Sequence, residues 1–480
     1  MKLIQIQITL LSILFIFTAC QDKGYGTQEI SKFPILTSMD KVIVQKSTPS
    51  KNIAQRAYIN IEFSAYIDPL TISTSTVSLN DSNGSTIPVE LNLLNANLRV
   101  LPKTSLTPTH TYTLSLSSAI TDLIGNSVDQ NYNFTYLCKS DFWQSVESGY
   151  THSSAISKEG DIYFWGTTLS VTLQGVIENK SIETYKAPLG ITKFQNPHTL
   201  SLGNNSSAII STTQTLILYK NISLDENVET NFNKLSLGNN HSVTIKNDKT
   251  LWSWGSNENG QLGNAGLLDK KQLVQEFTDS TDWIEVSAGE NYTVALKSDN
   301  TMWGWGENSY GQIGNSLLNE RRIPQQEDTN ATDWVSVSAG SNHTAAIKKD
   351  GTLWSWGLNS AGELGSGDNN SSRVAIQEST NATDWKYVSC GFDHTLALKN
   401  DGTLWVWGSS YYGQLGLGNS LNKNTPTKIA SLSGIVSISA GKYFSLAVDN
   451  NGTLWVWGRD NAHQLGLSTL HDQLSPQEVK

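Results

Sequence analysis

From Trp143 onward the chain repeats one pattern of apolar and polar positions, with a period of about fifty residues. A run that alternates apolar and polar residues leads up to a glycine, here called the anchor Gly, and Ser stands two residues before it in all but the first repeat. The anchors are Gly149, Gly203, Gly238, Gly289, Gly340, Gly391 and Gly441. Because side chains alternate between the two faces of a strand, each alternating run predicts a half-buried β-strand.

The unit around Gly340 predicts three further strands. His343–Ile347 is a second apolar run, and Asp350-Gly351 supplies the positive φ that a tight hairpin needs. Leu353–Trp356 would return with both Trp rings on one face, packed between units rather than free to bind a ligand. A weaker run such as Arg322–Gln325 would be the fourth strand, and its proline suits an outer edge. Four strands repeated at this period indicate a β-propeller.

The repeated motifs resemble one known family. Ala288-Gly289, Gly340-Ser-Asn-His343-Thr, Gly351-Thr-Leu-Trp354-Ser-Trp356-Gly357 and Gly413-Gln414-Leu415-Gly416 are similar to the repeats of the regulator of chromosome condensation family. The resemblance covers roughly residues 141–480 and implies an all-β, seven-bladed propeller, which we assign to residues 139–480.

Two departures lead to specific expectations about the ring. The repeat at Gly203 lacks the Trp-Gly and Gly-Gln-Leu-Gly pieces, so we expect a stunted blade there. The last residues, Leu474–Val479, match the weak fourth strand. We expect this strand to pair beside the strand that starts near Phe142 and so to lock the ring.

Residues 37–138 predict a different β-domain. Short alternating runs, such as Tyr58–Phe63 and Tyr112–Leu116, are separated by turn sequences over about one hundred residues, which is typical of an antiparallel sandwich. Phe63-Ser64, Asp68-Pro69 and Asp122–Asn126 resemble a bacterial immunoglobulin-like domain. The resemblance implies a spacer.

The N-terminus is predicted to be a targeting segment. Lys2 precedes an apolar run, Leu10–Phe17, that is too short to span a bilayer and has the form of a secretory signal. Phe17-Thr18-Ala19-Cys20 resembles a bacterial lipoprotein box, which implies that residues 1–19 are removed and that Cys20 is acylated. An ordinary signal peptide with an incidental Cys is the alternative. Residues 20–36 would then be a tether, and Gln21 after the Cys favours the outer membrane by analogy with Gram-negative sorting.

Charge and cysteine content narrow the functional classes. The chain carries 33 basic and 43 acidic residues, for a net charge of −10, without a basic cluster, which argues against binding to nucleic acid. Three Cys in 480 residues exclude a disulfide-stapled scaffold. A disulfide between Cys138 and Cys390 stays possible in an oxidising compartment, although Cys390 replaces the Ala of other repeats and is expected to be a small core residue.

Few residues suggest chemistry. His152, His241, His343 and His394 share one repeat position, which raises the hypothesis of a metal site. Equivalent residues lie far apart around a propeller, and Tyr292 and Phe444 take the same position, so we favour buried His side chains that bond nearby backbone. No phosphate-binding loop, nucleophile elbow or zinc-protease motif is present, so we predict no enzyme, cofactor or metal.

Positions that vary between repeats are the better candidates for binding, because packing does not dictate them. Loop aromatics and charges on a rigid scaffold are typical of a binding surface. We select Tyr310, Phe392, Asp393, Tyr411, Tyr412, Lys442 and Tyr443.

Together these features predict a lipid-anchored binding protein of the bacterial cell envelope whose propeller presents loops to a protein partner. The best-known member of the resembled family is an exchange factor for a nuclear GTPase, an activity that the signal segment argues against. Secreted bacterial propellers that bind and inhibit enzymes are a closer analogy. A carbohydrate or cell-wall binder and an extracytoplasmic enzyme with a site in the propeller mouth are the alternatives.

Overall fold

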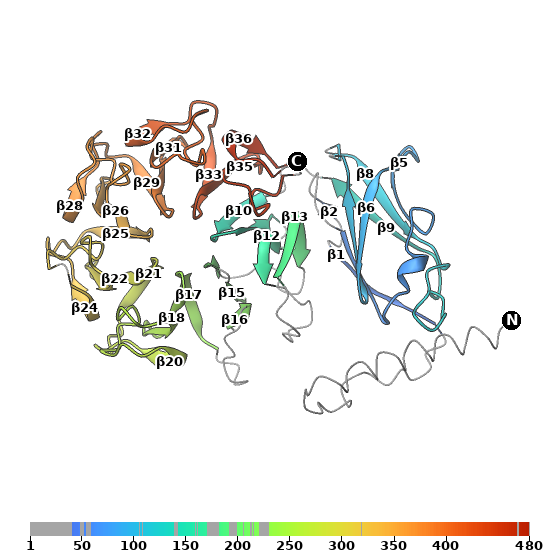
Figure 1. The fold of residues 1–480 in the computed structure, drawn as a ribbon, viewed down its shortest axis with the longest axis horizontal. Coiled ribbons are helices and arrows are strands. Elements are labelled where there is room, and N and C mark those ends of the chain that lie inside the picture. The colour runs from blue at the N-terminus through green and yellow to red at the C-terminus, as the bar shows by residue number, and fades with distance from the viewer. Residues whose placement is uncertain are drawn as a thin grey trace, which may run out of the picture.

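The computed structural model describes two β-domains (Figure 1). It covers residues 41–479, apart from 49–51, 54–58, 105, 108, 139–142, 159, 161, 170–181, 192–198, 205, 212–213, 215, 220–229, 318 and 468–469. The predicted signal segment, Cys20 and the tether lie outside these described residues. Within them, no helix is long and apolar enough to cross a membrane.

The N-terminal domain is a sandwich of two sheets, as predicted. The first sheet has the order β1 (Val44–Thr48), β3 (Ile59–Phe63), β7 (Asn97–Pro102) and β6 (Val89–Leu94). The second has the order β2 (Asn52–Ile53), β9 (Tyr132–Cys138), β8 (Thr111–Leu116), β4 (Val77–Asp81) and β5 (Thr86–Ile87). Alternate residues of β8, namely Tyr112, Leu114 and Leu116, are buried in the core between the sheets.

The residues that carry the immunoglobulin-like resemblance build turns. Asp68 caps the short 3₁₀ helix η2 (Pro69–Thr71), and its Oδ1 accepts a hydrogen bond from the backbone N of Leu70 at 3.0 Å. Asp122 is buried, and its carboxylate accepts the backbone N–H groups of Ile124 and Asn126 at 3.0 and 2.9 Å. Both carboxylates therefore stabilise local backbone, which fits a structural role for these motifs.

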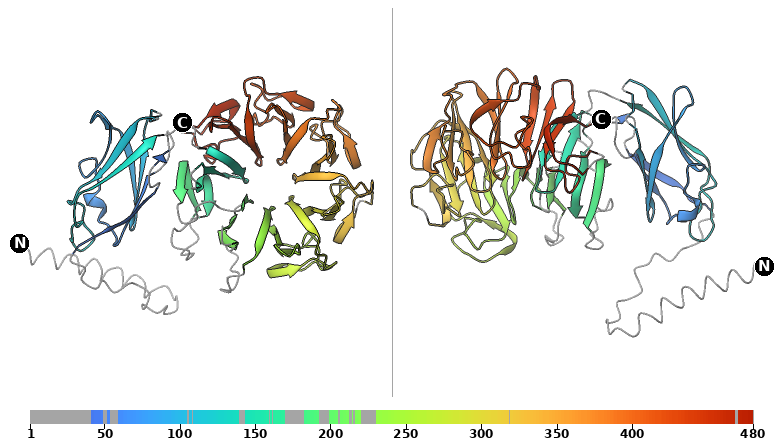
Figure 2. Two further views of the ribbon diagram at one scale, coloured as in Figure 1. Left: turned by 180° about the vertical axis from the view of Figure 1, so that it is seen from behind. Right: turned by 45° about the horizontal axis from the view of Figure 1, so that its top comes forward.

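The C-terminal domain is a ring of seven blades, numbered here 1 to 7 in chain order (Figures 1 and 2). Blade 1 holds β10 (Trp143–Ser148), β11 (His152–Ser157), β12 (Ile162–Leu169) and β13 (Ile182–Ile191), and blade 2 holds β14 (Thr199–Leu202), β15 (Ser207–Ile210) and β16 (Leu216–Tyr219). Blade 3 holds β17 (Phe232–Leu237), β18 (His241–Lys246), β19 (Leu251–Gly255) and β20 (Lys270–Gln275). Blade 4 holds β21 (Trp283–Ala288), β22 (Tyr292–Lys297), β23 (Met302–Gly306) and β24 (Arg321–Gln326).

The last three blades repeat the same order of four antiparallel strands. Blade 5 holds β25 (Trp334–Ala339), β26 (His343–Lys348), β27 (Leu353–Gly357) and β28 (Ser372–Gln377). Blade 6 holds β29 (Trp385–Cys390), β30 (His394–Lys399), β31 (Leu404–Gly408) and β32 (Lys423–Lys428). Blade 7 holds β33 (Ile435–Ala440), β34 (Phe444–Asp449), β35 (Leu454–Gly458) and β36 (Gln473–Glu478).

The predicted strands and turns of the repeat are confirmed. Gly351 has a φ of 80° in the hairpin between β26 and β27, and Asn300 takes the same left-handed conformation in blade 4, at 62°. The weak run with Pro324 is the outermost strand of blade 4. The repeat at Gly203 has three described strands, and residues 220–229, which follow them, lie outside the described part of the chain, so the expected stunted blade stays a prediction.

The Trp residues hold neighbouring blades together. Trp356 is fully buried, and its indole N–H donates to the carbonyl oxygen of Gln312 in the preceding blade at 3.0 Å. Trp354, two residues earlier, contacts the ammonium group of Lys348, which lies 5.1 Å from its ring centroid and 4.8 Å from that of Trp334. The Trp pairs are therefore structural, as the sequence predicted.

The expected closure of the ring is wrong. The final strand β36 does not pair with β10; it pairs with β35 of its own blade, with Gln477 opposite Val456. Blade 7 is built from four consecutive strands and needs none from the start of the domain. The ring closes by packing β10 against β33 and β34, and the hydroxyl oxygens of Ser148 and Ser439 lie 2.6 Å apart across this junction.

Candidate functional site

The propeller has two unlike faces. Successive antiparallel strands reverse direction, so the loops after the first and third strands of a blade lie on one side of the ring, which we call the mouth face. Backbone hydrogen bonds join these two loops within a blade. In blade 6 Ser409 N donates to Asp393 O at 2.8 Å, and in blade 7 Arg459 N donates to Tyr443 O at 2.9 Å. The other side, which we call the hairpin face, carries the tight turns such as that at Gly351.

The anchor glycines form a tight ring around the central channel. A Cβ added to Gly340 would lie 2.6 Å from the carbonyl oxygen of Gly391 and 2.5 Å from Cε1 of His343. The anchors of blades 1 to 6 all face the carbonyl of the next anchor in this way, at 2.4 to 2.7 Å. The repeat therefore requires Gly here because neighbouring backbones approach too closely for a side chain.

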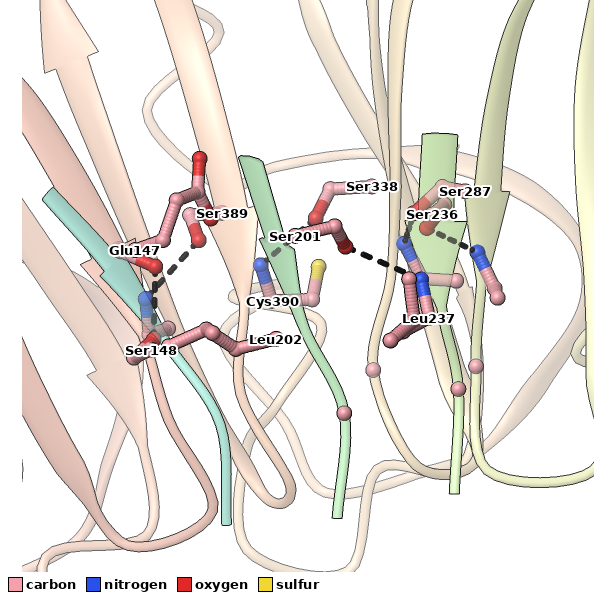
Figure 3. A pocket seen from close by; sticks show the side chains of 18 of the residues that line it. Glu147, Ser148, Ser201, Leu202, Ser236, Leu237, Ser287, Ser338, Ser389 and Cys390 are labelled. Atoms are coloured by element: carbon pink, nitrogen blue, oxygen red, sulfur yellow. Dashed lines mark hydrogen bonds between the residues drawn. The ribbon is translucent and has the colours of Figure 1, made fainter. Parts of the chain in front are cut away.

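A ring of serine side chains lies one layer deeper in the channel (Figure 3). The hydroxyl of each accepts a hydrogen bond from the backbone N of the next blade at 2.9 to 3.1 Å. These residues are Ser201, Ser236, Ser287, Ser338 and Ser389. In the first repeat Glu147 takes the serine position, and burial raises the pKa of its carboxyl to about 8.

The channel encloses a cavity of about 320 Å³ that is lined by the first strands of the blades. Tyr150, Phe392 and Lys442 lie at its edge, directly after the anchors of blades 1, 6 and 7. They connect the channel with the loops of the mouth face.

Aromatic side chains from three adjacent blades meet at the mouth. Phe392 lies 5.3 Å from Tyr443 and 6.4 Å from Tyr150, measured between ring centroids. Tyr412 lies 5.1 Å from Tyr443 and 4.8 Å from Tyr411. The contacts are tilted or edge-on, which are the favoured geometries for aromatic pairs.

Two cations cover these rings. The ammonium group of Lys442 lies 4.6 Å from the ring centroid of Tyr150, 4.8 Å from that of Phe392 and 5.6 Å from that of Tyr443. The guanidinium carbon of Arg459 lies 4.6 Å from the centroid of Tyr412 and 5.6 Å from that of Tyr443. We call the seven residues Tyr150, Phe392, Tyr411, Tyr412, Lys442, Tyr443 and Arg459 the mouth cluster.

The Gly-Gln-Leu-Gly motif positions part of this cluster. Gln414 is buried; its Oε1 accepts the backbone N–H of Tyr412 at 2.9 Å, and its Nε2 donates to Oδ1 of Asp393 at 3.1 Å. Burial raises the pKa of Asp393. The hydrogen bond from the Gln414 amide and the charge of Lys442 oppose this shift in part. Burial likewise raises the pKa of Glu290, and Lys442 opposes this shift.

The structure brings together all but one of the selected binding residues. Tyr310 belongs to blade 4, is 41% exposed and makes no ring contact with the described residues of the mouth cluster. Tyr411 is 75% exposed, whereas Phe392, Tyr412 and Tyr443 are half-buried. Most of these aromatics are therefore only partly exposed, because they pack on one another.

Sequence reasoning missed two members of the cluster. Tyr150 directly follows the anchor Gly of the first repeat, and we selected Phe392 and Lys442 because they take this position in other repeats. Arg459 follows the Trp-x-Trp-Gly motif, where other repeats carry Ser256, Glu307, Leu358 and Ser409. Variation at both positions was a usable signal.

The repeated His side chains are buried, as favoured from the sequence, and they link blades through hydroxyl groups of the next blade. His152 and His241 also bond backbone, at Ser206 and Tyr292. Nε2 of His394 lies 3.0 Å from Oγ of Ser445, and this hydroxyl donates its proton to the carbonyl oxygen of Gln414 at 2.8 Å. The proton of the hydroxyl is thus committed to backbone, and the imidazole acts as the donor. Burial lowers the pKa of His152, His241 and His343 to about 4, so these rings are neutral at pH 7.

The remaining candidates for chemistry are also structural. Cys138 lies in the sandwich core and Cys390 in the channel, and both are free thiols, so the disulfide left open by the sequence is absent. Within the described part of the chain, no three His, Cys, Asp or Glu side chains gather closely enough to hold a metal ion.

Family comparisons match both domains. The RCC1-like domain model matches residues 218–480, more than half of the chain. The chain belongs to the RCC1-like family. A bacterial Ig-like domain model matches residues 40–137, ahead of this RCC1-like propeller.

Individual relatives resemble only part of this RCC1-like protein. The ultraviolet-B receptor UVR8 of Arabidopsis thaliana is 32% identical over 182 residues, 37% of this chain and 41% of UVR8. Human HERC6, a probable E3 ubiquitin-protein ligase, is 30% identical over 202 residues, 40% of this chain and 20% of HERC6. The chain therefore spans less than half the length of these relatives.

Solved structures share the fold. Prp20p from Saccharomyces cerevisiae superposes with a TM-score of 0.55 at 20% identity and covers 71% of this chain and 88% of its own. Human WBSCR16 superposes with a TM-score of 0.50 at 20% identity, over 74% of this chain and 85% of its own.

Proposed function

We propose that this chain is a lipid-anchored protein of the bacterial cell envelope, held at the outer membrane, whose propeller binds a protein partner through its mouth face. The mouth cluster is the observation that carries the proposal. Tyr and Arg are among the residues most enriched at the energetic centres of protein interfaces, and here they lie on loops of a rigid scaffold. Prp20p, which shares the fold, is described as binding Gsp1p and histones.

The packing of the cluster favours a protein over a carbohydrate. Sugar stacking needs an open ring face, but Lys442 and Arg459 cover rings of Tyr150, Phe392, Tyr412 and Tyr443. Tyr411 alone in the cluster is mostly exposed. We assign no catalysis to the chain, because in three of the buried His–hydroxyl pairs the hydroxyl donates to a backbone carbonyl. These pairs are His241–Thr293, His343–Thr395 and His394–Ser445.

Affinity capture tests the proposed binding. The protein, crosslinked in intact cells and purified, should yield one dominant protein partner, and the variant Tyr411→Ala/Tyr412→Ala should lose it. Tyr310→Ala is the matched control, since this tyrosine is exposed on the same face outside the cluster. Capture of glycan alone, or equal capture by the double variant, would contradict the proposal.

The anchor is supported by the sequence Phe17-Thr18-Ala19-Cys20 and by the polar segment that follows it. Cells grown with an alkyne-bearing fatty acid should label the wild-type protein and not Cys20→Ser. Protease treatment of whole cells then distinguishes a surface position from a periplasmic one. Labelling of Cys20→Ser at the wild-type level would show that Cys20 is not the acylated residue.

A further inference from the structure

Arg459 carries a charge that no group of the described residues neutralises directly. Among the described residues its guanidinium makes no hydrogen bond and no ion pair; it is held only against the rings of Tyr412 and Tyr443. By contrast, Arg322 on an outer strand forms an ion pair, in which its Nη2 lies 2.8 Å from Oε1 of Glu320. Arg459 therefore presents a positioned but unused set of N–H donors at the mouth.

Lys442 is in a similar position. Its ammonium group contacts three rings but makes no hydrogen bond or ion pair with any described residue. The charge of Lys442 opposes the rise in pKa that burial causes at the carboxyls of Glu290 and Asp393, but neither carboxyl forms an ion pair with it. Asp393 accepts a hydrogen bond from Gln414. Both cations contact the ring of Tyr443, so two positive groups flank one aromatic side chain.

This arrangement selects an anionic ligand group. Rings that hold a cation reduce the entropy it loses on binding, and a planar guanidinium can take a carboxylate with two parallel hydrogen bonds. We propose that the mouth cluster recognises an acidic side chain in the protein partner, with Arg459 binding its carboxylate and Lys442 adding the second positive charge. This inference rests on the proposed protein-binding function.

Exposed apolar side chains on the mouth face favour an acidic segment of protein over a free anion. Leu421 and Leu470 are 64% and 53% exposed on the loops between the third and fourth strands of blades 6 and 7, which belong to the mouth face. Tyr411, also in blade 6, is 75% exposed. Exposed apolar side chains on the face that carries the charged centre match a peptide that carries apolar residues beside its Asp or Glu.

Selection from a phage-displayed library of random linear peptides tests the inference on the full chain. Peptides selected by the wild-type protein should be enriched in Asp or Glu next to apolar residues. A selected peptide should bind Arg459→Gln about tenfold more weakly and Arg459→Lys at an intermediate level, because Lys keeps the charge but not the paired donors. Replacing the acidic residue of the peptide with its amide should cause a similar loss, while Arg322→Gln should bind like the wild type.

The outcomes separate this inference from the proposed function. Peptides that bind the mouth without an excess of acidic residues, or that bind Arg459→Gln as tightly as the wild type, would overturn the inference and leave the proposed function standing. Binding of oligogalacturonate in place of any peptide would overturn both, since the ligand would then be an anionic glycan. Failure to select any peptide above a no-protein control would also count against the inference.

Discussion

The buried carboxylate of Glu327 gives the sharpest stability prediction. It lies after the fourth strand of blade 4 and is 1% exposed. Its Oε2 accepts the backbone N–H of Thr329 at 2.7 Å. Its Oε1 accepts the hydroxyl of Thr329 at 2.8 Å, the N–H of Ala331 at 3.0 Å and the indole N–H of Trp334 at 3.2 Å. One side chain thus fixes the turn into blade 5 and the first Trp of that blade.

The expected cost of Glu327→Gln follows from these bonds. The Gln oxygen can keep the three donors that meet Oε1, but its NH₂ group then faces the N–H of Thr329. One hydrogen bond to a charged acceptor is lost, and the Thr329 N–H and the new NH₂ group then face each other without an acceptor, which costs about 2–3 kcal/mol. Glu327→Ala removes every acceptor and should cost about 4–5 kcal/mol, at the upper end for single substitutions.

Urea unfolding followed by Trp fluorescence measures this effect in the propeller alone, because all 15 Trp lie at or beyond Trp143. We expect Glu327→Gln to lower Tm by about 3–6 °C and the urea midpoint in proportion. Asp328→Asn is the matched control, since Asp328 is the exposed carboxyl next in the chain and an amide can still accept from Ser316. If Glu327→Gln unfolds at the wild-type midpoint, the hydrogen bonds of this carboxylate do not stabilise the propeller.

Three further predictions concern the blade junctions and the anchor. The pKa of His343 is lowered from 6.5 to about 4 in the folded state, so its contribution to stability is lost as pH falls from 6.5 through 4, by up to about 3 kcal/mol. His343→Phe, chosen because Phe444 occupies the same repeat position, should reduce the drop in urea midpoint between pH 7 and pH 4, and an unchanged drop would contradict the assignment. Gly340→Ala should destabilise the propeller by about 1–3 kcal/mol through steric overlap. Gly367→Ala is the control and should cost about 1 kcal/mol, because φ is +93° there but the space is open. Equal costs in urea unfolding would count against a close-packed ring. Cys20→Ser should move the protein from the membrane to the soluble fraction on centrifugation of broken cells, and continued sedimentation with membranes would argue for a different attachment.

Much of the fold could be predicted because each repeated residue has a local task. Gly351 closes a hairpin, Pro324 lies on an outer strand, and Trp356 packs between blades, in the way that their spacing indicated. These roles depend on the residue and its near neighbours in sequence, so one unit predicts the others.

Features that depend on the closed ring could not be predicted in the same way. Both β35 and β10 were available partners for the last strand, and the choice depends on register in three dimensions. In the sequence, Glu327 is indistinguishable from other acidic residues of polar loops. Only the folded turn shows the four hydrogen bonds that its carboxylate accepts.

The mouth cluster shows the same limit. Tyr150 and Tyr443 are nearly three hundred residues apart in the chain, and both lie against Phe392 only because blades 7 and 1 meet where the ring closes. The sequence identified variable positions, but it could not show that those of blades 6, 7 and 1 gather while Tyr310 stays apart.

Hydrogen–deuterium exchange of the propeller, with and without its captured partner, tests whether the partner binds at the mouth face. Binding at the mouth face should slow exchange in the segments 391–393, 411–413, 442–443 and 458–460 and leave exchange unchanged in the hairpins at 299–301, 350–352 and 401–403. Protection of the hairpin face, with the mouth segments unaffected, would contradict it.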